Sequence, residues 1–117
     1  MKIGSKCFFF SLLIMINTAL TGQRSINYFQ HLIVEDGLSD GTNHFIYKDS
    51  RGFIWLSSLN GLNRYDGKEL KPFRYNPEDP NSVHGQYVQG QFIETDNRYI
   101  WFTSFDGLNC YDWKQKK

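Results

Sequence analysis

The sequence predicts an all-β protein made of propeller blades, each a four-stranded antiparallel sheet. Residues 49–67 and 96–113 share an order of residues in which most identities lie 46 positions apart. A period in the mid-forties is typical of one blade. Both stretches combine aromatic and β-branched runs with Asn-Gly or Asp-Gly dipeptides, which favours strands joined by tight turns. A propeller typically has 4–8 blades, so about two blades make an incomplete one.

Residues 1–22 are predicted to be a secretory signal peptide. Lys2 and Lys6 precede an apolar run over residues 7–16, and small or polar residues follow it. This is the order of regions in a signal peptide, and ten apolar residues are too few for a membrane-spanning helix, which needs about 20. A buried apolar helix is the alternative. We expect cleavage after residue 22 and a periplasmic location.

The chain after residue 22 divides into three predicted parts. Residues 23–41 hold a strand over 27–34, which would close a propeller by pairing with its last blade. Residues 42–85 form the first blade and a linker, and residues 86–117 form a truncated second blade. The expected strands cover residues 42–48, 53–56, 62–65 and 70–75 in the first blade and 86–94, 99–103 and 108–111 in the second.

Two details of the repeat predict local structure. The Asn-Gly or Asp-Gly dipeptides at 60–61, 66–67 and 106–107 predict tight hairpin turns with positive φ at both central residues. Upstream, Phe-Ile at 45–46 matches Phe-Ile at 92–93 at a spacing of 47 rather than 46. We therefore expect the second copy to lack one residue in the turn before its tryptophan.

The repeated positions are interpreted as structural. They are Asp49, Gly52, Trp55, Gly61, Tyr65 and Asp66 in the first blade and Asp96, Trp101, Gly107, Tyr111 and Asp112 in the second. A ligand occupies one place on a propeller, so a residue found in every blade more often packs than binds. We expect the tryptophans to pack rather than stack on a carbohydrate, and Asp49 and Asp96 to form turns rather than act as acids. No ligand-binding residue is assigned.

Composition argues against several function classes. After residue 22 the chain has 11 basic and 12 acidic residues, a net charge of −1, which gives no reason to expect nucleic acid or membrane contact by this segment. Its three histidines lack metal-ligand spacing, and Cys110 has no partner cysteine in this part. We expect no metal, no cofactor and no catalytic residue.

These residues resemble the two-component regulator propeller repeat. In that family a blade has Asp-x-x-Gly-x-x-Trp and then a Gly-Leu-x-x-Tyr-Asp hairpin, and residues 49–55 and 61–66 have both patterns. Residues 35–39 and 79–83 look like the family's leader and its link between blades. The second blade departs from the pattern, because it has no glycine matching Gly52 and has Trp113 where the first has glycine.

The resemblance implies the N-terminal periplasmic sensor region of a hybrid two-component histidine kinase, which feeds a phosphorelay. Many members of that family sense oligosaccharides, so an oligosaccharide is the expected ligand in the full-length context. We expect a fragment that is not itself an enzyme, because no kinase module is present. The alternatives are a fragment of a propeller-type glycan-active enzyme, and an inert or self-assembling binding fragment. The open faces of two blades favour further blades or self-association.

Overall fold

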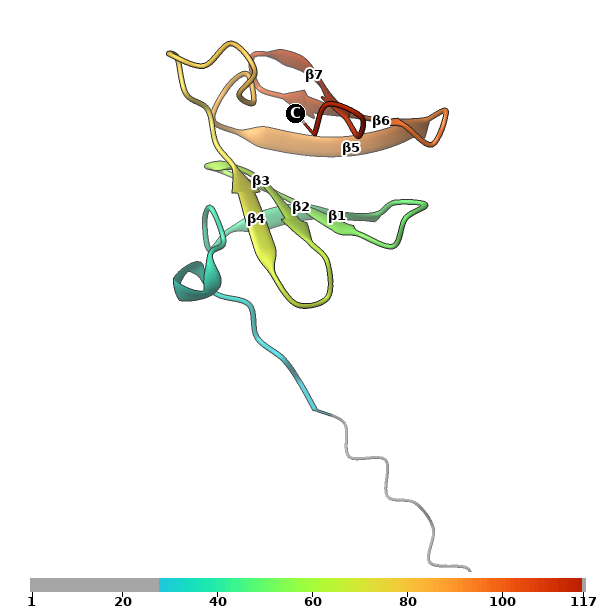
Figure 1. Ribbon diagram of the computed structural model, residues 1–117. Helices are drawn as coiled ribbons and strands as arrows, with labels where there is room; N and C mark the ends of the chain where they lie inside the picture. The colour runs from blue at the N-terminus through green and yellow to red at the C-terminus, as the bar shows by residue number, and fades with distance from the viewer. Residues whose placement is uncertain (1–27, 117) are drawn as a thin grey trace, which may run out of the picture. The chain divides into compact units, whose positions relative to one another are not determined.

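The computed structural model describes residues 28–116, which contain two antiparallel sheets and almost no helix (Figure 1). The all-β prediction is confirmed. The signal peptide expected over residues 1–22 lies outside the described residues. Among the residues that are described, no helix is long and apolar enough to cross a membrane.

Each sheet follows chain order, so neighbouring strands are joined by short connections. The first sheet contains β1 (Asn43–Lys48), β2 (Ile54–Ser58), β3 (Gly61–Tyr65) and β4 (Leu70–Phe73). The second sheet contains β5 (Val88–Thr95), β6 (Tyr99–Ser104) and β7 (Gly107–Asp112). All seven strands overlap the segments expected from the aromatic and β-branched runs.

Within the described residues, the closing strand expected over residues 27–34 pairs with neither sheet. Residues 28–33 have no regular secondary structure, and η2 (Val34–Asp36) is a short 3-10 helix. The carboxylate of Asp36 accepts a hydrogen bond from the backbone N–H of Ile33 at 3.0 Å, and Gly37 follows with a φ of 111°. A side chain that hydrogen-bonds the backbone of a residue three positions earlier favours a turn over a strand.

The β2–β3 hairpin turns one residue earlier than expected. Ser58 pairs with Gly61, so Leu59 and Asn60 form the loop, and Asn60 is not among the residues with positive φ. Glycine is needed at 61 for a different reason. A Cβ there would collide with the carbonyl oxygen of Phe73 in β4, and the φ of 127° is one that other residues rarely adopt.

The other two predicted hairpins differ from the prediction as well, one in the position of its loop and one in the length. Ser104 pairs with Gly107, which again places the loop one residue earlier. Tyr65 pairs with Leu70, so the loop at Asp66 has four residues. The carboxylate of Asp66 accepts backbone hydrogen bonds from the two residues that close this loop, at 2.8 and 2.7 Å. A carboxylate that binds nearby amides stabilises a longer loop than the dipeptide alone indicates.

The strand register corrects the alignment of the two copies. Tyr47 pairs with Trp55 in the first sheet, and Ile93 pairs with Trp101 in the second. Equivalent residues therefore lie 46 positions apart on both sides of the turn that precedes each tryptophan. The two turns have the same length, and the residue expected to be missing from the second one is not missing.

The change of spacing arises within β5 instead. The pairing of β5 with β6 is irregular between Gly90 and Ile93, and Gln91 has a φ of 58°. A β-bulge inserts an extra residue into one strand in this way. The Phe-Ile pairs at 45–46 and 92–93 are thus alike in sequence but do not occupy equivalent places.

The apolar core lies between the two sheets. The ring of Tyr47 in β1 stacks on that of Phe92 in β5 with centroids 5.5 Å apart, and Trp55 meets Tyr111 edge-on at 5.1 Å. The buried apolar residues of this cluster are Trp55, Leu62, Val83, Val88, Ile100, Phe102 and Tyr111. The side chains that join the sheets thus come from one face of each.

Candidate functional site

The turn before β2 holds Trp55 through one carboxylate. Asp49 accepts hydrogen bonds from the backbone N–H groups of Arg51 and Phe53 at 3.0 and 2.9 Å, and from the indole Nε1 of Trp55 at 2.7 Å. Asp49 is 4% exposed and Trp55 is fully buried. Gly52 completes the turn with a φ of 89°. Every hydrogen bond that the structure shows for Asp49 therefore stabilises this turn or the ring of Trp55.

The second sheet builds the same turn from different residues. The hydroxyl of Thr95 accepts a hydrogen bond from the indole Nε1 of Trp101 at 3.0 Å. Thr95, rather than Asp96, therefore occupies the place of Asp49. Asp96 and Asn97 adopt left-handed conformations, with φ of 54° and 48°, in the turn that has no glycine. Asp and Asn tolerate this region better than most residues, which explains how the turn closes without one.

An asparagine in each sheet binds the segment that enters that sheet. In the first sheet the side-chain oxygen of Asn63 accepts the backbone N–H of Ser39 at 2.8 Å, and its Nδ2 donates to the Ser39 hydroxyl at 2.9 Å. The hydroxyls of Ser39 and Ser58 lie 2.7 Å apart. All three residues are buried, so this small polar network is satisfied internally.

The second sheet repeats this arrangement 46 residues later. The side-chain oxygen of Asn109 accepts the backbone N–H of His84 at 2.8 Å, and the hydroxyl of Ser104 donates to the His84 carbonyl oxygen. Both the asparagine and the serine recur at the repeat spacing, so the sequence contained a signal for this contact. The sequence analysis did not assign a role to these residues, because they bind backbone groups, which every residue type carries.

A guanidinium lies among the aromatic rings between the sheets. Arg64 of β3 donates a hydrogen bond to the Tyr111 hydroxyl at 2.8 Å, and its charge lies 4.8 Å from the ring centre of Phe53 and 5.0 Å from that of Trp113. Cations over aromatic faces are attracted by the ring electrons. Trp113, which replaces the Gly67 of the first copy, thus adds a ring to the contact between the sheets.

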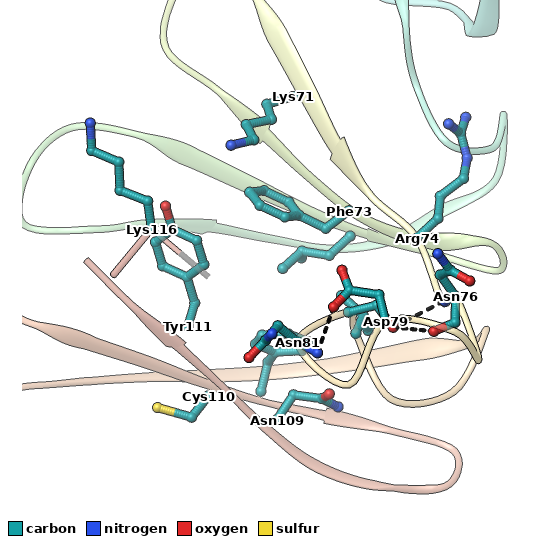
Figure 2. A pocket seen from close by; sticks show the side chains of 14 residues that line it. Lys71, Phe73, Arg74, Asn76, Asp79, Asn81, Asn109, Cys110, Tyr111 and Lys116 are labelled. Atoms are coloured by element: carbon teal, nitrogen blue, oxygen red, sulfur yellow. Dashed lines mark hydrogen bonds between the residues drawn. The ribbon is translucent and has the colours of Figure 1, made fainter. Parts of the chain in front are cut away.

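A groove of about 530 Å³ lies between β4, the linker that follows it and β7 (Figure 2). Phe73 and Tyr111 contribute rings to its lining, and Lys71, Arg74 and Lys116 contribute positive charge. The groove runs along the edge of β7. The corresponding edge of β3 in the first sheet is paired with β4, whereas β7 pairs only with β6 among the described strands. We interpret the groove as the space beside an unpaired strand edge.

The shifted ionisable groups include one salt bridge and one thiol. Arg98 binds the carboxylate of Asp112 with both ends of its guanidinium, at 3.0 and 2.6 Å, and this contact lowers the pKa of Asp112 to about 2. Partial burial of the Cys110 thiol raises its pKa, which disfavours the reactive thiolate. Within residues 28–116, no three His, Cys, Asp or Glu side chains gather to hold a metal ion.

The repeat positions taken from the sequence do not converge on one site. Asp49 and Trp55 lie together, as do Tyr111 and Trp55, at the contact between the sheets. Tyr65 lies on the opposite face of the first sheet, because side chains alternate along a strand. Asp96 is exposed in a turn. No set of these side chains has the mutual geometry of a nucleophile, an acid and a charge clamp.

Comparison with known proteins gives one partial similarity. No family model matches the chain. Over 65 residues, 56% of its length, the sequence is 37% identical to "Histidine kinase P4" of Formosa agariphila (strain DSM 15362 / KCTC 12365 / LMG 23005 / KMM 3901 / M-2Alg 35-1). The match covers 5% of that protein. The chain therefore resembles a small part of a signal-transduction protein.

Proposed function

We propose that this chain is a ligand-sensing segment of a two-component sensor, in which each sheet is one blade of a β-propeller. The observation that carries the proposal is the 46-residue repeat, which folds into two sheets of the same strand order. Four-stranded antiparallel sheets in chain order are the units of a propeller. The partial similarity to a histidine kinase supports the assignment to two-component signalling.

The proposed ligand is an oligosaccharide, and the proposed compartment is the periplasm. The resemblance of residues 49–55 and 61–66 to the two-component regulator propeller repeat supports the ligand class, and the basic and apolar order of residues 1–22 supports export. The chain itself carries no catalytic step in this proposal. Its role is to form part of the propeller whose other blades complete the ligand site.

The experiment is ligand-dependent phosphorylation of the protein encoded by the whole reading frame. We expect a soluble oligosaccharide to change autophosphorylation of the attached kinase in membrane vesicles. A kinase that responds to no member of a broad oligosaccharide panel would contradict the proposed ligand class. A reading frame without a kinase would contradict the signalling role.

A further inference from the structure

A cavity lies at the strand ends where the first sheet leads into the second. Its volume is about 550 Å³, and we call it the loop cavity. Among its lining residues, Tyr75 follows β4, residues 84–87 precede β5, and residues 105–106 form the β6–β7 loop. The loop cavity is therefore built from loops and not from a face or an edge of either sheet. Its volume is typical of a ligand pocket, which measures roughly 300–1,000 Å³.

The β6–β7 loop has a position that stays exposed beside a neighbouring sheet. Phe105 in this loop is 74% exposed. By strand register its equivalent in the β2–β3 loop is Leu59, which is 45% exposed although the second sheet packs against the first. A further sheet packed in the same way against the second one would therefore leave Phe105 partly accessible.

The aromatic rings of the loop cavity do not belong to the repeat. By strand register, Tyr87 corresponds to Thr42 in the first sheet. His84 corresponds to Ser39, because the asparagine of each sheet accepts a hydrogen bond from the backbone N–H of that residue. The phenylalanine of the β6–β7 loop and the leucine of the β2–β3 loop are a third such pair. The first sheet thus forms the same loops without rings, so the packing of a blade does not require rings at these positions.

The backbone around the loop cavity is held in place. The backbone N–H of Phe105 donates to the carbonyl oxygen of Tyr87 at 2.9 Å, which ties the β6–β7 loop to the segment before β5. Gly85 has a φ of 84°, and a Cβ at this position would lie 2.7 Å from a carboxylate oxygen of Asp106. Glycine therefore allows the carboxylate to lie close to the backbone. A site held in this way needs little ordering when a ligand binds.

The lining combines exposed rings with hydrogen-bonding groups of both kinds. The rings of Tyr75 and His84 meet edge-on with centroids 6.3 Å apart, and Tyr75 is 40% exposed. The amide of Gln86 both donates and accepts hydrogen bonds, whereas the carboxylate of Asp106 accepts them. A sugar ring suits this lining, because it has an apolar C–H face that an aromatic ring can cover and hydroxyls that donate and accept. Among the described residues, Asp106 supplies the one carboxylate of the lining, and its charge disfavours an anionic ligand.

We propose that the loop cavity binds one sugar unit of an uncharged oligosaccharide, with Tyr75 and Phe105 stacking on the sugar and Asp106 accepting hydrogen bonds from its hydroxyls. The inference rests on the proposed sensing function and adds the place of contact and the charge class of the ligand. The repeated tryptophans keep their packing role in this proposal.

Binding to an array of neutral and acidic oligosaccharides tests the proposal. The protein encoded by the whole reading frame is used, and we expect wild type to bind neutral members. Tyr75→Ala and Phe105→Ala should each weaken this binding by roughly tenfold, because each removes a stacking ring. Leu59→Ala is the matched control, since it truncates the equivalent loop position of the first sheet, and it should leave binding unchanged. Thermal unfolding of the three variants should match that of wild type, because all three side chains are exposed.

Asp106→Asn tests the charge class, because it keeps the shape of the side chain and removes its charge. We expect this variant to narrow the preference for neutral over acidic members, and an unchanged preference would overturn the role of Asp106. Binding to neutral members that neither ring variant weakens would place the site elsewhere and overturn the loop cavity, while the sensing function would stand. Binding to acidic members alone would overturn the charge class. Wild type that binds no member of the array would contradict the sensing function itself.

Discussion

Replacing Trp55 with alanine should destabilise the fold more than any other single aromatic substitution. Its indole is fully buried, lies 5.1 Å from the ring centre of Tyr111 and 6.0 Å from those of Phe73 and Trp113, and donates a hydrogen bond to Asp49. The substitution therefore removes packing from both sheets and one partner of the turn before β2.

The expected loss follows from these contacts. Truncation of a buried tryptophan to alanine costs about 3–5 kcal/mol of unfolding free energy, because the cavity collapses only in part. Within that range, the unpartnered carboxylate oxygen of Asp49 accounts for about 1–3 kcal/mol. Trp55→Phe helps to separate the two contributions, since it keeps one aromatic ring in the core but removes the hydrogen bond and the second ring of the indole.

Trp101→Ala is the matched control. Trp101 has the equivalent position in the second sheet, but it is only half-buried, pairs with the ring of Tyr99 at 6.2 Å and bonds the hydroxyl of Thr95. We expect it to cost about 1–2 kcal/mol.

The assay is urea unfolding followed by far-ultraviolet circular dichroism, which does not depend on the deleted indole. If the loss exceeds the stability of wild type, Trp55→Ala will be unfolded without urea while Trp101→Ala keeps a cooperative transition. Equal losses for the two variants would refute the reasoning, since burial between the sheets is what distinguishes them. Unchanged stability of Trp55→Ala would mean that its indole serves a ligand rather than packing.

Three further predictions concern other parts of the chain. Asn63→Ala should cost about 1–3 kcal/mol, because it leaves the buried backbone N–H of Ser39 without its acceptor, and limited proteolysis should then cut the leader faster. The folded state lowers the pKa of Asp112 from 3.8 to about 2, so its contribution to stability is complete above pH 3.8 and is lost as the pH falls towards 2. Asp112→Asn should flatten the acid limb of unfolding in that window, and an unchanged limb would contradict the role of its ion pair. The exported protein should begin at residue 23 when its N-terminus is sequenced, and a product that keeps Met1 would exclude cleavage.

The strands could be predicted because their signal is local. Runs such as Phe-Ile-Trp-Leu at 53–56 are short, aromatic and branched, and the strand β2 begins within one residue of the expected start. The exact residues of the turns were harder to predict. Asn-Gly at 60–61 indicates a turn, but the pairing of Ser58 with Gly61 places the loop at residues 59 and 60. Glycine is needed at 61 because of the carbonyl oxygen of Phe73 in β4, a residue from the next strand of the chain.

The β-bulge in β5 and the hydrogen bonds of the two asparagines could not be predicted from the sequence, for physical reasons. Phe-Ile at 92–93 matches Phe-Ile at 45–46 in letters, while hydrogen-bond register, which letters do not encode, assigns Ile93 to the place of Tyr47. The partner of Asn63 is a backbone N–H, and any residue except proline supplies one. Of the residues expected at the candidate site, Asp49 and Trp55 are in contact, whereas in the second sheet Thr95 rather than Asp96 has the position of Asp49.

The reading frame beyond the codon for Lys117 tests the central claim most directly. If each sheet is a propeller blade of a two-component sensor, sequencing the genomic DNA downstream will show an in-frame continuation. Further repeats, each with a tryptophan at the position of Trp55 and spaced by about 45 residues, should precede a histidine kinase. A stop codon, or a continuation without such repeats, would contradict the sensor assignment.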